Sequence, residues 1–177
     1  MPVDGRAVDP SRLPVAACRP TGEGSLMGLP QADIDLAGLT LFSGLTAAEL
    51  DAVAQEFEEE HAQQGKRLSR QGFEGSGFYV VISGEADWLI AGQHVDRAAT
   101  TFGLPPKPVT LRRGDWFGEL SVLFGEAAIS DVYALTPMHL LVLPGHELEG
   151  FLFRYPKVMF QLLKGEARRL RDPERWK

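Results

Sequence analysis

The feature that most constrains the fold is a series of short β-type runs, punctuated by glycine, between residues 65 and 143. The runs cover residues 67–70, 78–83, 86–90, 108–112, 132–135 and 139–143. Glycines at positions 72, 75, 77, 84, 92 and 114 fall between or beside them, where turns need positive φ. Short strands at this spacing predict an antiparallel barrel or jelly roll. Residues 91–107 have weaker periodicity, which predicts a long surface loop.

Helical patterns flank this β region on both sides. Thr46 is a candidate N-cap, and Glu49, three residues on, completes a capping box ahead of apolar residues at helical spacing. After Pro144 one apolar helical face is followed by Pro156, which can occupy the first turn of another helix. The predicted fold is therefore mainly β: an antiparallel jelly-roll barrel with a short N-terminal helix and two C-terminal helices.

The first 36 residues differ from the rest in composition. Prolines stand at positions 2, 10, 14, 20 and 30, with glycines between them, and periodic apolar residues begin only near Leu36. This predicts a flexible Pro/Gly-rich tail over residues 1–36 and one domain over 37–177. The tail lacks the basic start and apolar core of a signal peptide, and no stretch approaches the roughly 18 apolar residues of a membrane span. We therefore expect a cytoplasmic protein with no membrane span.

Charge and reactive residues argue against several functions. The net charge of −6 disfavours binding a polyanion by bulk electrostatics. Cys18 is the only cysteine, so no internal disulfide or paired-thiol metal site forms. The histidines, His61, His94, His139 and His146, are dispersed without a His-x-His pair. We therefore predict no metal site and no catalytic residues, and keep a cupin-like metal enzyme only as a remote alternative.

The run from Arg113 to Glu126 carries the most chemical information. It reads as a tight turn that leads into a short helix. Gly118 would let a ligand approach the backbone, and the amides of Gly118, Glu119 and Leu120 would point outward as donors to an anion. The Glu119 carboxylate would accept a hydrogen bond from a sugar hydroxyl. Taken alone, a Gly-Glu-Leu sequence at a helix start is more often ordinary helix capping.

The ordered pattern over about residues 38–171 resembles the cyclic nucleotide-binding domain of bacterial catabolite activators, kinase regulatory subunits and gated channels. The resemblance is carried by Gly65, Gly72, the run 78–85, Gly114-Asp115 and the run 117–120. It implies an eight-stranded jelly roll, a phosphate-binding cassette over residues 114–131, and a C-terminal helix that serves as a lid or dimer interface. The implied ligands are cAMP or cGMP, or a related sugar-containing molecule. The candidate ligand-binding residues are Phe117, Gly118, Glu119, Leu120, Ser121, Ala128, Ile129 and Ser130.

The cassette departs from the family where the cyclic phosphate would bind. Ala128 stands where the family has an arginine, and Asp131 stands where threonine is usual. One charge-assisted bond is worth about 1.5 to 3 kcal/mol, or roughly ten- to a hundredfold in affinity. We therefore predict weak or altered nucleotide binding. A substitute cation would have to come from elsewhere in the β region, and the candidates are Arg70, Arg97, Lys107, Arg112 and Arg113.

Two functions follow from these residues. The first is a non-catalytic regulatory or sensor domain whose ligand closes the cassette and repositions the terminal helices. The alternative is a ligand-independent module that forms a homodimer or binds a partner protein through its C-terminal helix. Val158, Leu162 and Leu163 could form that seam, although packing on the barrel explains them equally well. The sequence stops at Lys177 without a helix-turn-helix pattern, so we expect no DNA-binding domain.

Overall fold

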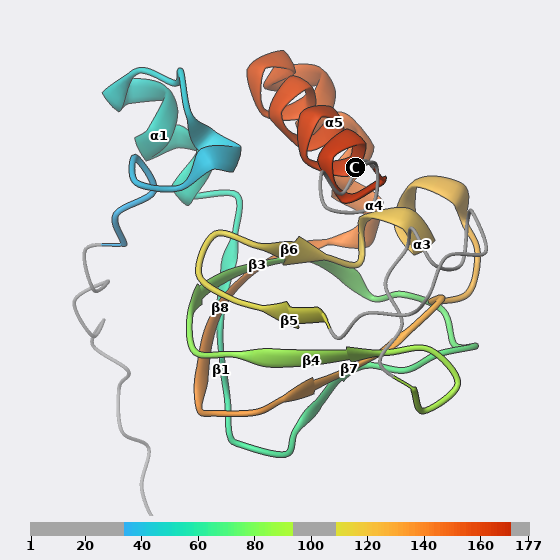
Figure 1. Cartoon of the computed structure of the whole chain (residues 1–177). Helices are drawn as coiled ribbons and strands as arrows, with labels where there is room; N and C mark the ends of the chain where they lie inside the picture. Colours follow the sequence, from blue (N-terminus) through green and yellow to red (C-terminus); the bar gives the residue numbers. More distant parts are fainter. Residues whose placement is uncertain (1–33, 94–108, 171–177) are drawn as a thin grey trace, which may run out of the picture. The chain divides into compact units, whose positions relative to one another are not determined.

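The computed structural model describes residues 34–93 and 109–170, all within the unit Asp33–Lys177. Two four-stranded antiparallel sheets form its centre (Figure 1). The first has the order β1-β8-β3-β6, and the second has the order β2-β7-β4-β5. The strands are β1 (Glu58–Ala62), β2 (Arg67–Ser69), β3 (Gly77–Ser83), β4 (Ala86–Leu89), β5 (Val109–Leu111), β6 (Trp116–Phe117), β7 (Asp131–Ala134) and β8 (Met138–Pro144). The prediction of antiparallel β-sheets with flanking helices is confirmed.

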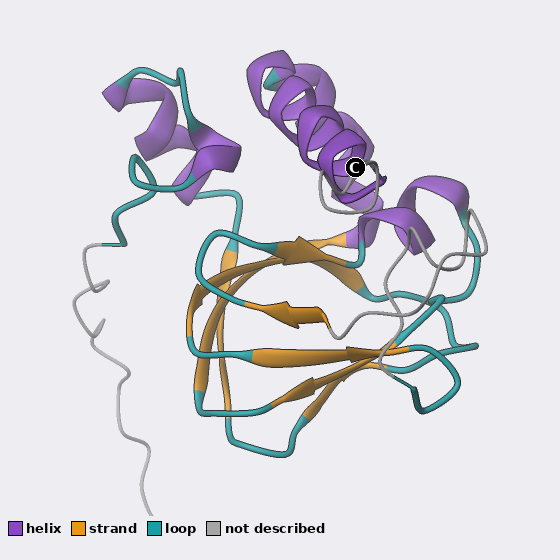
Figure 2. Ribbon diagram, in the orientation of Figure 1, coloured by secondary structure: helices purple, strands orange, loops and turns teal. Residues whose placement is uncertain are grey.

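The helices lie before, within and after the strands (Figure 2). They are η1 (Thr40–Phe42), α1 (Ala47–Ala54), α3 (Glu119–Phe124), α4 (Gly145–Arg154) and α5 (Pro156–Leu170). α1 begins at the predicted capping box: the Glu49 amide donates to the Thr46 hydroxyl at 3.3 Å, and the Glu49 carboxylate accepts from the Thr46 amide at 2.6 Å. No described helix has the length and apolar character needed to cross a membrane.

Two apolar cores stabilise this arrangement. The first lies between the β1-β8-β3-β6 sheet and the helices, where Phe78 and Leu143 from the sheet pack with Phe151 and Val158 from α4 and α5. The second lies between the two sheets and includes Trp88 and Leu140. β3 contributes to both cores, which explains why its sequence is a continuous apolar run rather than an alternating one. β3 therefore positions both the helices and the cassette.

The sequence did not predict two of the strands, β1 and β6. Residues 58–60 look like the acidic exit of the first helix, but they form the start of β1, which pairs with β8. β1 is an edge strand with mostly exposed side chains, so polar residues are tolerated there and the apolar signal is weak. β6 is only two residues long. Most of the predicted 1–36 tail, and the 94–107 part of the predicted loop, lie outside the described residues.

Candidate functional site

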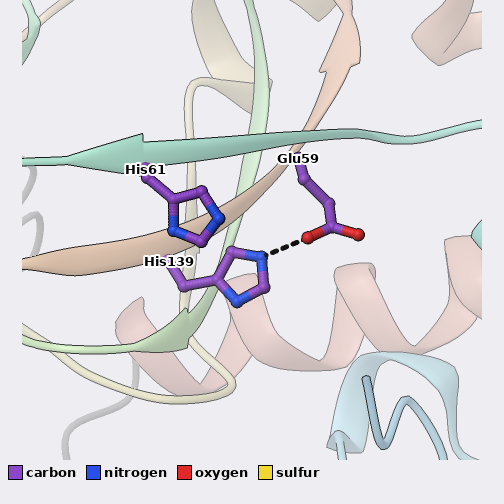
Figure 3. Close-up of side chains that lie close together, drawn as sticks. All are labelled: Glu59, His61 and His139. Carbon is purple, nitrogen blue, oxygen red and sulfur yellow. Dashed lines mark hydrogen bonds and ion pairs between the residues drawn. The ribbon is translucent and has the colours of Figure 1, made fainter. Parts of the chain in front are cut away.

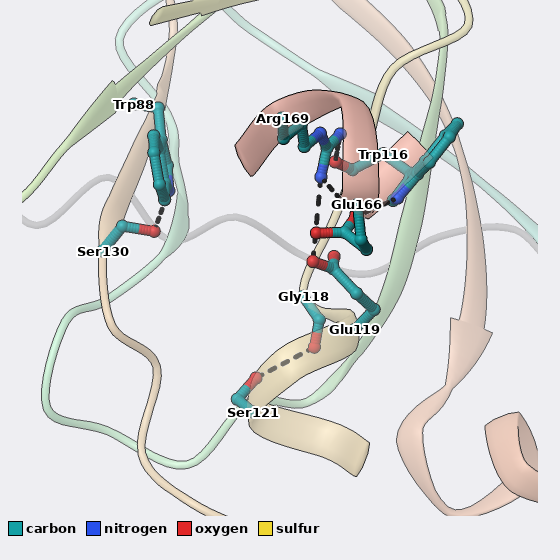
Figure 4. Close-up of polar contacts among 8 residues, drawn as sticks. All are labelled: Trp88, Trp116, Gly118, Glu119, Ser121, Ser130, Glu166 and Arg169. Carbon is teal, nitrogen blue, oxygen red and sulfur yellow. Dashed lines mark hydrogen bonds and ion pairs between the residues drawn. The ribbon is translucent and has the colours of Figure 1, made fainter. Parts of the chain in front are cut away.

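The candidate cassette, residues 114–131, includes the junction where β6 ends and α3 starts (Figure 4). Gly118 lies between them in the left-handed region, with φ of 91°. A Cβ atom here would overlap the carbonyl oxygen of Gly77 on β3. Glycine is therefore required by both the backbone conformation and the close approach to β3. α3 ends at Gly125, which is also left-handed.

Glu119 has no solvent exposure, and its carboxylate lies beside the terminal helix α5 (Figure 4). Its Oε1 is 3.7 Å from Nη1 of Arg169. Arg169 also donates to Glu166 Oε1 at 3.0 Å and to the Trp116 carbonyl oxygen at 2.6 Å, and its guanidinium lies 4.8 Å from the Trp116 ring centroid. Burial lowers the pKa of Arg169, while the charges of Glu119 and Asp115 oppose that shift.

The other side of the cassette is closed by its own side chains. The Trp88 indole N–H donates to the Ser130 hydroxyl, and the Ser121 hydroxyl donates to the Gly118 carbonyl oxygen at 2.9 Å (Figure 4). Ser121 and Ser130 are both buried. The cavity between these groups measures only about 30 Å³. A drug-sized ligand occupies a pocket of about 300 Å³ or more, so a nucleotide needs this cavity to open.

The structure brings most of the predicted site residues together. Phe117, Gly118, Leu120, Ser121, Ala128, Ile129 and Ser130 all line the 30 Å³ cavity. Glu119 does not line it and contacts Arg169 instead. No pattern in the sequence linked Arg169 or Trp88 to the cassette, because both come from elements far from it along the chain. Arg169 belongs to a group of basic residues near the end of the last helix, Lys164, Arg168, Arg169 and Arg171, for which complementarity to the helix dipole is a sufficient structural reason.

The substitute cations proposed from the sequence divide into three groups. Arg70 lines a second cavity, of about 220 Å³, which shares Gly118 and Ser121 with the cassette, and its guanidinium lies 3.7 Å from the Phe73 ring centroid. Arg112 and Arg113 are engaged elsewhere, with the Glu85 carboxylate and the Ile82 carbonyl oxygen, each at 2.9 Å. Arg97 and Lys107 lie outside the described residues.

One further basic residue lines the second cavity. The guanidinium of Arg67 lies 3.8 Å from the Asp131 carboxylate and donates to the Tyr133 hydroxyl at 3.3 Å. Asp131, the residue that replaces the family's threonine, also accepts from the Gln71 amide at 3.2 Å. The acidic substitution is therefore partly neutralised by a neighbouring strand.

Comparison with known proteins assigns the class that this fold and cassette define. The profile of the cyclic nucleotide-binding domain family matches residues 59–155, and the chain belongs to that family. The chain is 32% identical over 140 residues to the cyclic AMP receptor protein of Thermus thermophilus, a match that covers 78% of this chain and 61% of the relative. It thus spans about three fifths of that relative.

Solved structures show the same fold. The crystal structure of the Thermus thermophilus catabolite activator protein has a TM-score of 0.62 and 28% identity, covering 76% of this chain and 60% of the other. The regulatory subunit of a cAMP-independent protein kinase A from Trypanosoma brucei has a TM-score of 0.60 and 23% identity, covering 79% of this chain and 47% of the other. The chain thus has the cyclic nucleotide-binding regulatory fold.

Proposed function

We propose that this chain is a non-catalytic regulatory domain in which cyclic-nucleotide binding is weak or altered. The proposal rests on the small volume of the cassette cavity and on the side chains that line it. Its residues enclose only about 30 Å³, and no lysine or arginine among the described residues lines that cavity. The fold alone does not oblige a domain to respond to cAMP, since one structural neighbour is named as part of a cAMP-independent kinase.

Three costs oppose the binding of a cyclic nucleotide. The phosphate would meet Ala128 rather than a cation, which removes a bond worth about 1.5 to 3 kcal/mol. The pocket would also have to open, which breaks the hydrogen bond between Trp88 and Ser130. A sugar hydroxyl would in addition compete with Arg169 for the Glu119 carboxylate. Each cost reduces affinity without removing the fold.

Calorimetric titration with cAMP and cGMP tests this proposal. We expect the unmodified protein to bind more weakly than about 100 µM, and Ala128→Arg to gain roughly ten- to a hundredfold in affinity. Phe124→Arg is a matched control, because Phe124 is 70% exposed on α3 and does not line the cavity.

Two results would contradict the proposal. One is binding by the unmodified protein tighter than about 100 µM that is lost in Glu119→Ala. The other is a folded Ala128→Arg variant with no gain in affinity, which would show that the missing arginine is not what limits binding.

A second candidate function is supported by the outer face of α5. Phe160, Leu163 and Leu170 are 58%, 61% and 37% exposed. Together with Ala167 they follow the alternating three- and four-residue spacing of a coiled-coil seam. Exposed apolar side chains in this pattern favour a partner helix or a second copy of the chain. Of the three residues named for a seam from the sequence, Val158 and Leu162 pack in the core, which is the alternative left open for them, and Leu163 is exposed.

A further inference from the structure

Two histidines and a glutamate meet on the β1-β8-β3-β6 sheet, away from the cassette (Figure 3). His61 on β1 pairs directly with His139 on β8, and Glu59 precedes His61 by two residues, so it lies on the same face. The two imidazole rings are stacked with centroids 4.4 Å apart and an interplanar angle of 20°. His139 Nε2 is 2.8 Å from Glu59 Oε2.

These three side chains form a donor set that suits a transition metal. One possible ligand atom from each lies within 4.8 Å of the other two. Imidazole and carboxylate are the usual nitrogen and oxygen ligands of Zn²⁺, at about 2.0 to 2.2 Å from the metal. In a tetrahedral site two such ligand atoms are about 3.4 Å apart. The His139–Glu59 pair would therefore open slightly, a change that side-chain torsions can supply.

An ordinary surface hydrogen bond accounts for only part of this cluster. It explains the contact between His139 and Glu59, but it does not explain why a second imidazole is stacked against the first. Two imidazoles held side by side by strand register, with a carboxylate at one of them, are already placed as three ligands. The His139 and Glu59 side chains are 15% and 28% exposed, so solvent reaches the cluster and can complete the coordination.

The geometry points to a divalent transition-metal site formed by Glu59, His61 and His139, with Zn²⁺ as the best-matched ion and water in the fourth position. The metal would join β1, which pairs only with β8 among the described strands, to its neighbour through side chains as well as through the backbone. This site is separate from the proposed function, because β8 and β3 lie between β1 and the cassette strand β6 in the sheet order.

Titration of the tag-free full chain with Zn²⁺, together with the absorption spectrum of the Co²⁺-loaded protein, tests the site. We expect one ion per chain, visible Co²⁺ bands of a low-coordinate site with nitrogen ligands, and a higher unfolding temperature with Zn²⁺. Loss of groups that merely orient a ligand costs about 10- to 100-fold in affinity, so His61→Ala and His139→Ala should each cost at least about 100-fold.

His146→Ala is the matched control, because the His146 side chain is 81% exposed and lies on α4, outside the cluster. It should leave affinity and spectrum unchanged. If His139→Ala fails to fold, His61→Ala still tests the site, because His61 is exposed. Absence of Zn²⁺ binding overturns the proposal, as does binding that survives His61→Ala or falls equally in His146→Ala.

Discussion

Replacing Arg169 with alanine is the most direct test of how the cassette is joined to α5. The substitution removes the 3.7 Å ion pair to Glu119, the hydrogen bond to the Trp116 carbonyl oxygen and the stacking on the Trp116 ring. Glu119, a carboxylate with no solvent exposure, thereby loses the Arg169 ion pair. Breaking a buried pair in this way costs about 3 to 5 kcal/mol. The Arg169 side chain is 24% exposed, which favours the lower end of that range.

Urea denaturation followed by circular dichroism measures this loss. We expect Arg169→Ala to lower the free energy of unfolding by about 3 kcal/mol, and the melting temperature by about 10 °C for a domain of this size. Arg168→Ala is the matched control, since Arg168 is exposed on the same turn and should change stability by less than about 0.5 kcal/mol.

A double-mutant cycle separates the ion pair from the other contacts of Arg169. Glu119→Gln removes the buried charge, so it should cost less in the Arg169→Ala background than alone. The expected coupling is about 1 to 2 kcal/mol. The reasoning fails if Arg169→Ala is as stable as Arg168→Ala, or if the Glu119 and Arg169 substitutions are additive within about 0.5 kcal/mol.

Two further predictions concern the helices. If α5 mediates self-association, Leu163→Glu should convert a dimer to a monomer in sedimentation experiments, because it places a charge in the exposed seam; a monomeric wild-type protein at high concentration would exclude homodimerisation. The pKa of Glu49 is lowered by the backbone hydrogen bond from its N-cap and then by the hydrogen bond from Lys157. Its stabilising contribution is therefore complete above about pH 4.3 and lost as the pH falls through the lowered pKa of the folded state. Glu49→Gln should remove this part of the acid dependence of unfolding, and an unchanged profile would show that these contacts do not persist in solution.

Most of the sheet could be predicted from the sequence because its central strands are apolar and end at glycines. The runs at residues 67–70, 78–83, 86–90 and 139–143 correspond to β2, β3, β4 and β8. β1 could not be predicted, since the sequence Glu-Glu-Glu-His-Ala lacks an apolar periodicity and its pairing with β8 spans about 80 residues. An edge strand can be specified by its partner rather than by its own propensity.

The candidate site, like the sheet, contains residues that could be predicted from the sequence and residues that could not. The cassette residues could be predicted because they are nearly contiguous, and a glycine before a short helix fixes where their backbone points. Arg169 and Trp88 could not, because each reaches the cassette from another element across a long stretch of chain. The pairing of His61 with His139 could not be predicted for the same reason, because strand register brings together two histidines that lie far apart along the chain.

The absence of an arginine from the cassette has a consequence for how the domain could signal. Arg169 on α5 supplies the positive charge beside Glu119. This charge therefore comes from the terminal helix rather than from a bound ligand. A ligand that engages Glu119 must compete with α5, and a partner that draws α5 away removes the Arg169 ion pair from Glu119. The two events are therefore linked through one ion pair, and any coupling between them must be reciprocal. Under the proposed function, a protein bound at α5 can alter the cassette even when the cassette binds nucleotide weakly.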